Sequence, residues 1–310
     1  MKEGNTMNNY ESHSDNAERW SEGLDFDAEW TEDYQLEHAE EITDVLLSME
    51  DEERRRPEME HDATLRANRI HEEIVFNKGE RYQKMVGDIS EVLDSDGVSL
   101  DIADNVDLKK MEYPFDYLLS KCMRFDFESK EAICQAVMDG IFDELKLAEE
   151  KRPVLMLVVS INGRVSKHGN STSDRDNKGE LGHFKEPGAQ FRHVDPRAKE
   201  NGIVRINLPN FDDNPDIRKI LATLEHECFH AYQFNCRRNN MPLNTVRDRV
   251  MQAAYTAGHN QYISSKNDYG GYYSQGYESS AREFSTQLMR ATDILMTEAI
   301  MRAMKGENDG

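Results

Sequence analysis

Basic residues are scarce in this 310-residue chain, where 38 Lys and Arg stand against 60 Asp and Glu for a formal net charge of −22 at pH 7. A protein that binds nucleic acid needs a basic surface to neutralise phosphates. We therefore expect no nucleic acid among its direct partners. The imbalance belongs to the amino-terminal half, because residues 1–150 hold 41 acidic and 16 basic residues.

Cysteine is also scarce, and its spacing excludes a dense disulfide framework. The four cysteines form no C-x-x-C pair: they are Cys122, Cys134, Cys228 and Cys236. We expect them to be reduced thiols, as is usual in a cytoplasmic protein.

Long apolar runs are missing as well. The first residues, MKEGNTMNNYESHSDN, contain no apolar stretch of the kind found in a signal peptide, and no later run is long enough to span a bilayer. We expect no membrane partner and a cytoplasmic location, with signal-independent secretion left open.

Composition and periodicity divide the chain into three regions. Residues 1–60 carry 20 acidic and five basic residues, and we expect them to be disordered because they bury too little apolar area to offset the entropy of ordering. An acidic arm that folds on a protein partner is the alternative. Residues 61–150 are expected to form a helical support region, with candidate helices at 62–86, 87–94, 114–122 and 128–150.

Residues 151–310 combine strand and helix patterns, which predicts an α+β fold. The apolar run Val154–Ile161 is expected to be a central strand that turns at Asn162-Gly163. The remaining elements follow in order: a polar loop at 167–182, strands at 190–194 and 202–208, a helix at 243–264, a glycine- and tyrosine-rich loop at 269–277, and a helix at 278–304.

The most informative motif is H-E-x-x-H at residues 226–230. On an α-helix, His226 and His230 lie one turn apart on one face, close enough to bind one ion, with Glu227 beside them. Asn214 is expected to cap this helix, with Pro215 at its first position. The core does not need the histidines, because the apolar stripe lies nearly opposite: Ile217, Ile220, Leu221, Leu224, Cys228 and Ala231.

A catalytic zinc ion takes three protein ligands and leaves a fourth position for water. The downstream candidates for the third ligand are Cys236, His259, Glu278 and Glu283. Cys236 stands where H-E-x-x-H-x-x-G-x-x-H proteases carry a histidine, but Gln233 replaces the glycine of that pattern. Glu278 borders the apolar stripe of the last helix, whereas Glu283 points away from it.

The segment from Glu278 to Met289 resembles the E-x-x-A-x-x-F-A-x-x-L-L signature of the ImmA/IrrE type of zinc metallopeptidase, with Ala281, Phe284 and Leu288 at matching positions. Together with H-E-x-x-H, the resemblance covers residues 151–310. It implies a zincin-like metallopeptidase domain with a small mixed sheet, an active-site helix and a carboxy-terminal ligand helix. It also implies that Glu278 joins His226 and His230 as the third zinc ligand.

Two further expectations concern the surroundings of the ion. Thermolysin-like proteases orient a histidine with an acidic residue four positions after the ligand glutamate, and here that position is Arg282. We therefore expect the orienting partner elsewhere, either a backbone carbonyl or Asn235. In such folds an edge strand beside the active-site helix aligns an extended peptide, and residues 202–208 are the expected strand.

The resemblance implies a zinc-dependent peptidase whose substrate is a peptide or protein. Glu227 would be the general base, accepting a proton from zinc-activated water and passing it to the leaving amine. The oxyanion would be stabilised by a phenol from Tyr272, Tyr273 or Tyr277, with His259 behind them, although loop tyrosines that only pack on the helix pair are the alternative. A competing hypothesis is an acidic binding or adaptor protein with an inactive or structural zinc site.

Overall fold

The computed structural model describes residues 52–102, 107, 110–158, 160–161, 164–165, 181–188, 195–208, 211, 216–238, 240–241, 246–265 and 267–305. The predicted strand at 190–194, nearly all of the predicted loop at 167–182 and residues 1–51 lie outside these ranges. Within them, no helix combines the length and apolar character needed to cross a bilayer.

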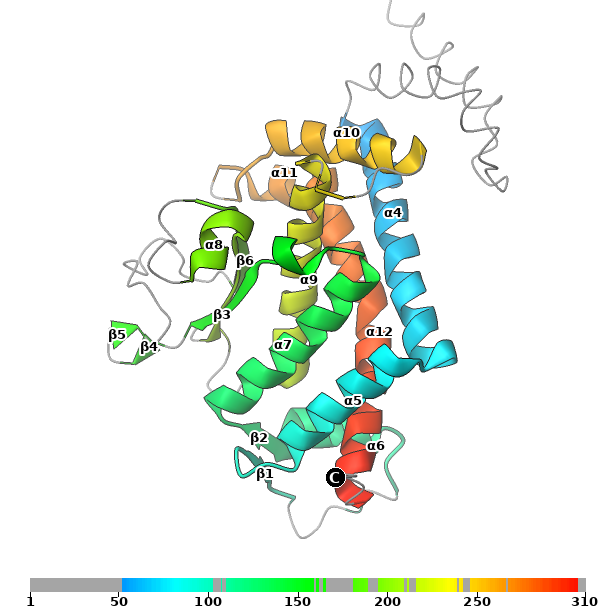
Figure 1. Cartoon of the computed structure of the whole chain (residues 1–310), viewed down its shortest axis with the longest axis vertical. Helices are drawn as coiled ribbons and strands as arrows, with labels where there is room; N and C mark the ends of the chain where they lie inside the picture. The colour runs from blue at the N-terminus through cyan, green and yellow to red at the C-terminus, as the bar shows by residue number, and fades with distance from the viewer. Residues whose placement is uncertain are drawn as a thin grey trace, which may run out of the picture.

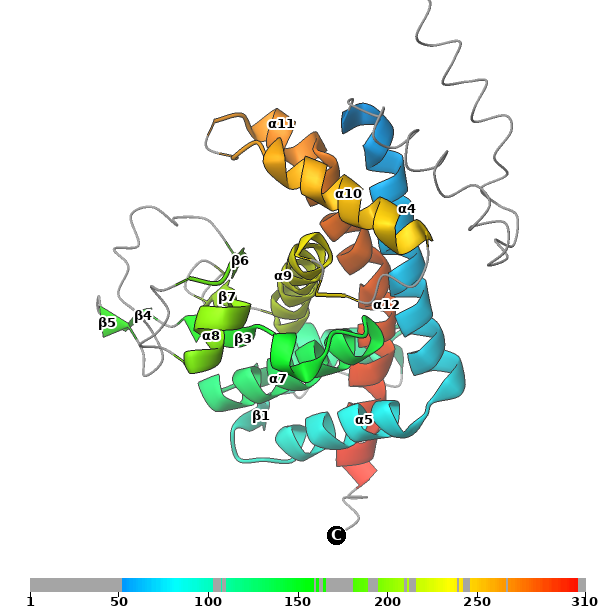
Figure 2. The same ribbon diagram turned by 45° about the horizontal axis from the view of Figure 1, so that its top comes forward.

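The described residues form an α+β fold in which helices predominate. α12 (Gly276–Lys305) is the central helix, and α4 (Glu52–Glu72), α5 (Glu80–Leu93) and α9 (Ile217–Arg237) all pack against it (Figure 1). α7 (Phe127–Glu144) packs between α5 and α9. α4 lies along α12, as Figure 2 also shows. The small residues Ala63 and Ala67, four positions apart in α4, are completely buried.

A small separate hydrophobic cluster consists of Met156, Val158, Ala198 and Ile203. The main hydrophobic core runs through the described residues from Met59 in α4 to Ile300 in α12. It crosses the predicted boundary between residues 150 and 151, because α7 and α9 contribute to the same cluster. The nine residues Glu52–Glu60, at the end of the predicted acidic segment, form the first turns of α4.

Several helix boundaries differ from the predicted ones. The predicted break at 86/87 is wrong: the chain turns after a π-helical turn at Glu73–Asn77, where Lys78 adopts a left-handed conformation with φ 41°. Asp126 caps α7 by accepting a hydrogen bond from the Ser129 amide at 2.7 Å. α7 ends at Glu144, before a short 3-10 turn at Glu149–Lys151.

A small two-stranded sheet in the helical region was not predicted from the sequence. β1 (Val98–Leu100) pairs with β2 (Met123–Phe125) in antiparallel orientation. Between them lie α6 (Pro114–Tyr117) and a π-helical turn at Leu118–Cys122, where a single helix at 114–122 was predicted.

The main sheet has the described strand order β3-β7-β6. β7 (Ile203–Asn207) pairs in parallel with β3 (Val154–Val158) and in antiparallel orientation with β6 (Gly182–Lys185). The apolar run predicted as one central strand is therefore divided: β3 lies at one side of this sheet, and β4 (Ser160–Ile161) pairs separately with β5 (Arg164–Val165). β7, which was expected to be the edge strand, lies in the centre, and β6 borders it on the side opposite β3.

The remaining helices frame the sheet and α9. α8 (Pro196–Asn201) leads into β7 through Gly202, whose φ of 85° favours glycine. α10 (Val246–Asn260) packs on α9 and is shorter than the predicted helix at 243–264. The predicted loop at 269–277 contains α11 (Tyr269–Ser274).

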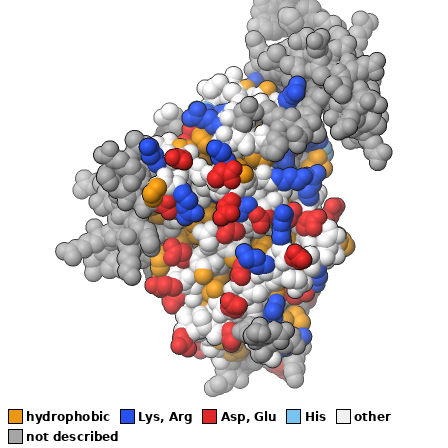
Figure 3. All heavy atoms as spheres, in the orientation of Figure 1, with side chains coloured by type: hydrophobic (Ala, Val, Ile, Leu, Met, Phe, Trp, Pro, Cys, Tyr) orange, Lys and Arg blue, Asp and Glu red, His pale blue; other side chains and the backbone are white. Residues whose placement is uncertain are grey.

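Acidic and basic side chains are interspersed on the face drawn in Figure 3. The sequence supports this picture, because residues 1–51 alone hold 16 of the acidic and only two of the basic residues. The described part of the chain is thus much closer to charge balance than the whole.

Candidate metal centre

The helix that carries H-E-x-x-H is fixed by its apolar stripe. All six stripe residues predicted from the sequence are completely buried. The helix begins differently from the prediction: Asp216, not Asn214, is the N-cap, and its carboxylate accepts a hydrogen bond from the Arg218 amide at 2.9 Å. His226 and His230 then face the start of α12.

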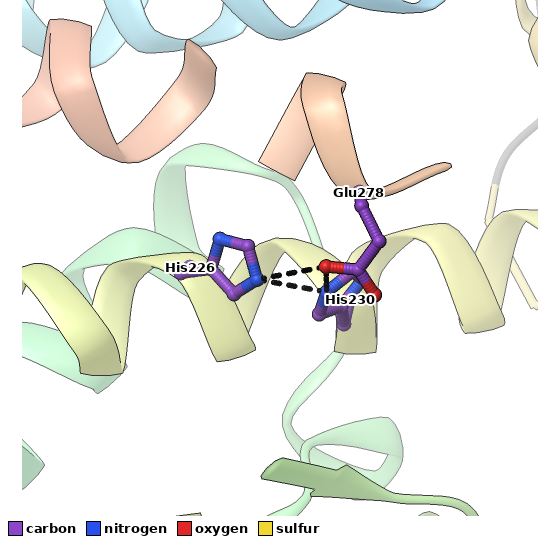
Figure 4. Close-up of side chains that lie close together, drawn as sticks. All are labelled: His226, His230 and Glu278. Atoms are coloured by element: carbon purple, nitrogen blue, oxygen red, sulfur yellow. Dashed lines mark hydrogen bonds and ion pairs between the residues drawn. The ribbon is translucent and has the colours of Figure 1, made fainter. Parts of the chain in front are cut away.

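The first turn of α12 is placed by a close contact with α4. A Cβ atom at Gly276 would lie 2.9 Å from Met59 Sδ and 3.1 Å from Arg56 Cα, so only glycine lets the two helices approach this closely. Glu278 lies two residues later, in the first turn, and its side chain points back towards α9 (Figure 4).

The three predicted ligands converge on one point. His226 Nε2 and His230 Nε2 are 3.0 Å apart, and each lies 3.4 Å from Glu278 Oε2 (Figure 4). Four ligands placed about 2.0–2.1 Å from a tetrahedral zinc ion stand about 3.3 Å apart, so the three donor atoms have the spacing of one face of such a tetrahedron.

Glu278 Oε2 is the atom that most needs a cation. It is buried and has no hydrogen-bond partner among the described residues. Burial alone would raise the pKa of Glu278, but the neighbouring His230 and His226 hold that pKa well below its usual range. Burial alone would lower the pKa of His230. The negative charge of Glu278 outweighs this effect of burial and raises the pKa of His230 to about 9. Without an ion, therefore, the proton on His230 balances the carboxylate.

Gln233 fixes the orientation of the His230 ring. Its side-chain amide nitrogen donates to the Tyr277 carbonyl at 3.0 Å and to Ser280 Oγ at 2.9 Å. A carbonyl can only accept, so the amide oxygen of Gln233 must face His230, where it accepts from Nδ1–H at 2.7 Å. His230 Nδ1 therefore carries a proton, and Nε2 is left to bind an ion.

Glu278 is held through its other oxygen. The Tyr262 hydroxyl donates to Glu278 Oε1 at 2.8 Å, and the Tyr272 hydroxyl also interacts with this carboxylate. Burial and the adjacent Glu278 raise the pKa of both phenols, so both keep their protons.

Glu227 faces the sheet beside the cluster. Its Oε2 accepts a hydrogen bond of 2.6 Å from the Phe184 amide of β6. Gly182 makes room for this contact, because a Cβ there would lie 2.5 Å from Thr223 Cγ2 and 3.0 Å from Glu227 Cγ. Glu227 is thus fixed against the backbone of β6.

The tyrosines proposed for the oxyanion have different surroundings. Tyr277 is buried and stacks on the His230 ring, with centroids 5.2 Å apart. Tyr273 is exposed, and its ring packs on the Arg282 guanidinium and on Tyr269 rather than on a ligand.

The other candidate ligands point elsewhere. Glu283 accepts a hydrogen bond from the Thr64 hydroxyl of α4. His259 Nδ1 lies 3.6 Å from Glu186 Oε1. Cys236 is buried near Arg66, and burial raises the pKa of its thiol to about 12.

Asn235 was one of the two partners expected to orient a histidine, but it donates to the Ala231 carbonyl and accepts from Asn240. Gln233 takes that role. Its position three residues after His230 was a usable signal, because helical residues at that spacing are neighbours. Tyr262 could not have been found this way, since it was assigned to the preceding helix.

His226, His230 and Glu278 form a group that could hold a metal ion, with two nitrogen donors and one oxygen donor. This donor set is one that zinc accepts. No protein-family model matches the chain, and no curated protein or solved structure matches it either. The assignment therefore rests on geometry.

Proposed function

We propose that this chain is a zinc-dependent peptidase with a zincin-like fold. The observation that carries the proposal is the convergence of two imidazole nitrogens and one otherwise unpartnered carboxylate oxygen beside the glutamate of the same motif. A structural zinc site usually has four protein ligands and needs no such glutamate, whereas a catalytic site keeps a position free.

His226, His230 and Glu278 would hold the ion. Zinc supplies an activated water near neutral pH and polarises a carbonyl group. Glu227, adjacent to the ligands but outside the group of three, would take the proton from that water and deliver it to the leaving amine. Tyr277, whose ring packs on His230, and Tyr272, which interacts with Glu278, are the candidates for stabilising the negative charge that would develop.

An extended peptide would bind along β6 rather than along β7. In the described sheet, β6 pairs with β7 on one side only. The Leu181 carbonyl accepts a hydrogen bond from the Asn207 amide. Because the backbone polar groups of successive residues alternate between the two sides of a strand, those of Gly182 and Phe184 point away from β7. That side faces Glu227, which places a paired substrate backbone next to the proposed base.

Replacement of the base tests the proposal. Zinc-loaded wild type and Glu227→Gln are incubated with a proteome-derived peptide library, and new termini are counted by mass spectrometry. We expect about one zinc per chain in both proteins and a loss of cleavage on the order of 10²-fold or more in the variant. Equal cleavage by the two proteins, or no cleavage by zinc-loaded wild type, would contradict the proposal.

A further inference from the structure

The carboxylate of Glu278 is shared between two kinds of partner. Oε1 accepts the Tyr262 hydroxyl at 2.8 Å, whereas Oε2 faces the two histidines. A hydrogen bond from a hydroxyl to an ionised carboxylate is among the stronger kinds, and this carboxylate is almost fully buried. Oε1 is therefore committed before any ion arrives.

The position of Tyr262 is fixed by hydrogen bonds between its neighbour Ile263 and Gln275. The buried Gln275 side chain accepts from the Ile263 amide at 2.9 Å and donates to the Ile263 carbonyl at 3.0 Å. The Gln275 backbone carbonyl in turn accepts from the Glu278 amide at 3.1 Å. One residue thus ties the start of the ligand helix to the residue next to Tyr262.

From this geometry we propose that Tyr262 is a positioning residue that restricts Glu278 to coordinating metal through Oε2 alone. The inference rests on the proposed metal site and deepens it. A carboxylate free to use both oxygens fills two coordination positions and suits larger, oxygen-loving ions such as Ca²⁺. A carboxylate limited to one oxygen leaves a position open for water and favours a compact N,N,O site.

Cobalt substitution makes the coordination visible, because tetrahedral Co²⁺ absorbs visible light more strongly than five- or six-coordinate Co²⁺. Purified full-length wild type, Tyr262→Phe and Tyr269→Phe are each loaded with Co²⁺, and zinc affinity is measured by competition with a chelator. Tyr269 begins α11, seven residues after Tyr262, and is largely exposed, with its ring against Tyr272 and Tyr273, so it is the matched control.

We expect Tyr262→Phe to weaken zinc binding about 10- to 100-fold and to lower the visible absorption of the cobalt form. Gln275→Ala should change both in the same direction, and Tyr269→Phe should match wild type. A Tyr262→Phe protein with wild-type zinc affinity and cobalt spectrum would overturn the inference, even if its thermal stability fell. Failure of wild type to bind Co²⁺ or zinc would instead overturn the proposed function on which it rests.

Discussion

The two best-supported ligands of the candidate metal centre are held in different ways. His230 is oriented by Gln233 and Ser280, both fully buried between α9 and α12. Glu278 is oriented by Tyr262, which lies on a loop and is 42% exposed. The buried support depends on core packing, and the loop support can change without disturbing the core. We infer that both supports fix the geometry of the candidate site, and that only loss of the first also destabilises the core.

The largest effect should follow from breaking the buried support. Gln233→Leu removes the partner of His230 Nδ1 and one of the two side-chain donors to the Tyr277 carbonyl, the other being Ser280 Oγ. We expect zinc affinity to fall about 10- to 100-fold and the free energy of unfolding to fall by about 1–3 kcal/mol. Chelator competition and denaturant titration measure these two quantities.

Asn235→Ala is the matched control for this change. Asn235 is buried on the same helix but hydrogen-bonds only within the helix end, to Ala231 and Asn240. It should lower stability and leave zinc affinity unchanged. If both variants weakened zinc binding equally, the orienting role of Gln233 would be refuted.

A smaller effect is expected where α9 meets β6. Gly182→Ala would press a methyl group on Thr223 and Glu227 and move the proposed base. We expect peptide cleavage to fall on the order of tenfold while zinc content stays at wild-type level. Gly79→Ala is the control, because a Cβ there has open space and φ is −69°. Lost zinc in Gly182→Ala would contradict the separation of base from ligands.

The smallest effect is expected on removal of the metal, and it compares the two supports directly. Chelation should increase amide hydrogen exchange in residues 262–265 and 267–275, which include α11, several-fold more than in residues 226–237, because the first set has fewer buried side chains. Mass spectrometry of the zinc-loaded and chelated full chain measures this difference. An equal increase in α9 would mean that the two supports are not distinct.

Local patterns in the sequence predicted the ligand cluster better than its surroundings. Helical periodicity placed His226 and His230 opposite the buried stripe, and Glu278 was implied by the resemblance of the last helix to a metallopeptidase signature. Strand order was missed because it depends on pairing between distant segments: β7 looked like an edge but is covered on both sides. The Glu227 contact with Phe184 spans 43 residues and has no local signal.

The close approach of α4 to α12 at Gly276 has a consequence for how the protein acquires its structure. A chain trimmed to residues 151–310 would carry α12 with the side that meets α4 and α5 open to water, and the turn bearing Glu278 would lose its brace. The upstream helices therefore share one hydrophobic core with the helix that carries the histidines, and the group of His226, His230 and Glu278 can come together only after both halves of the sequence have assembled.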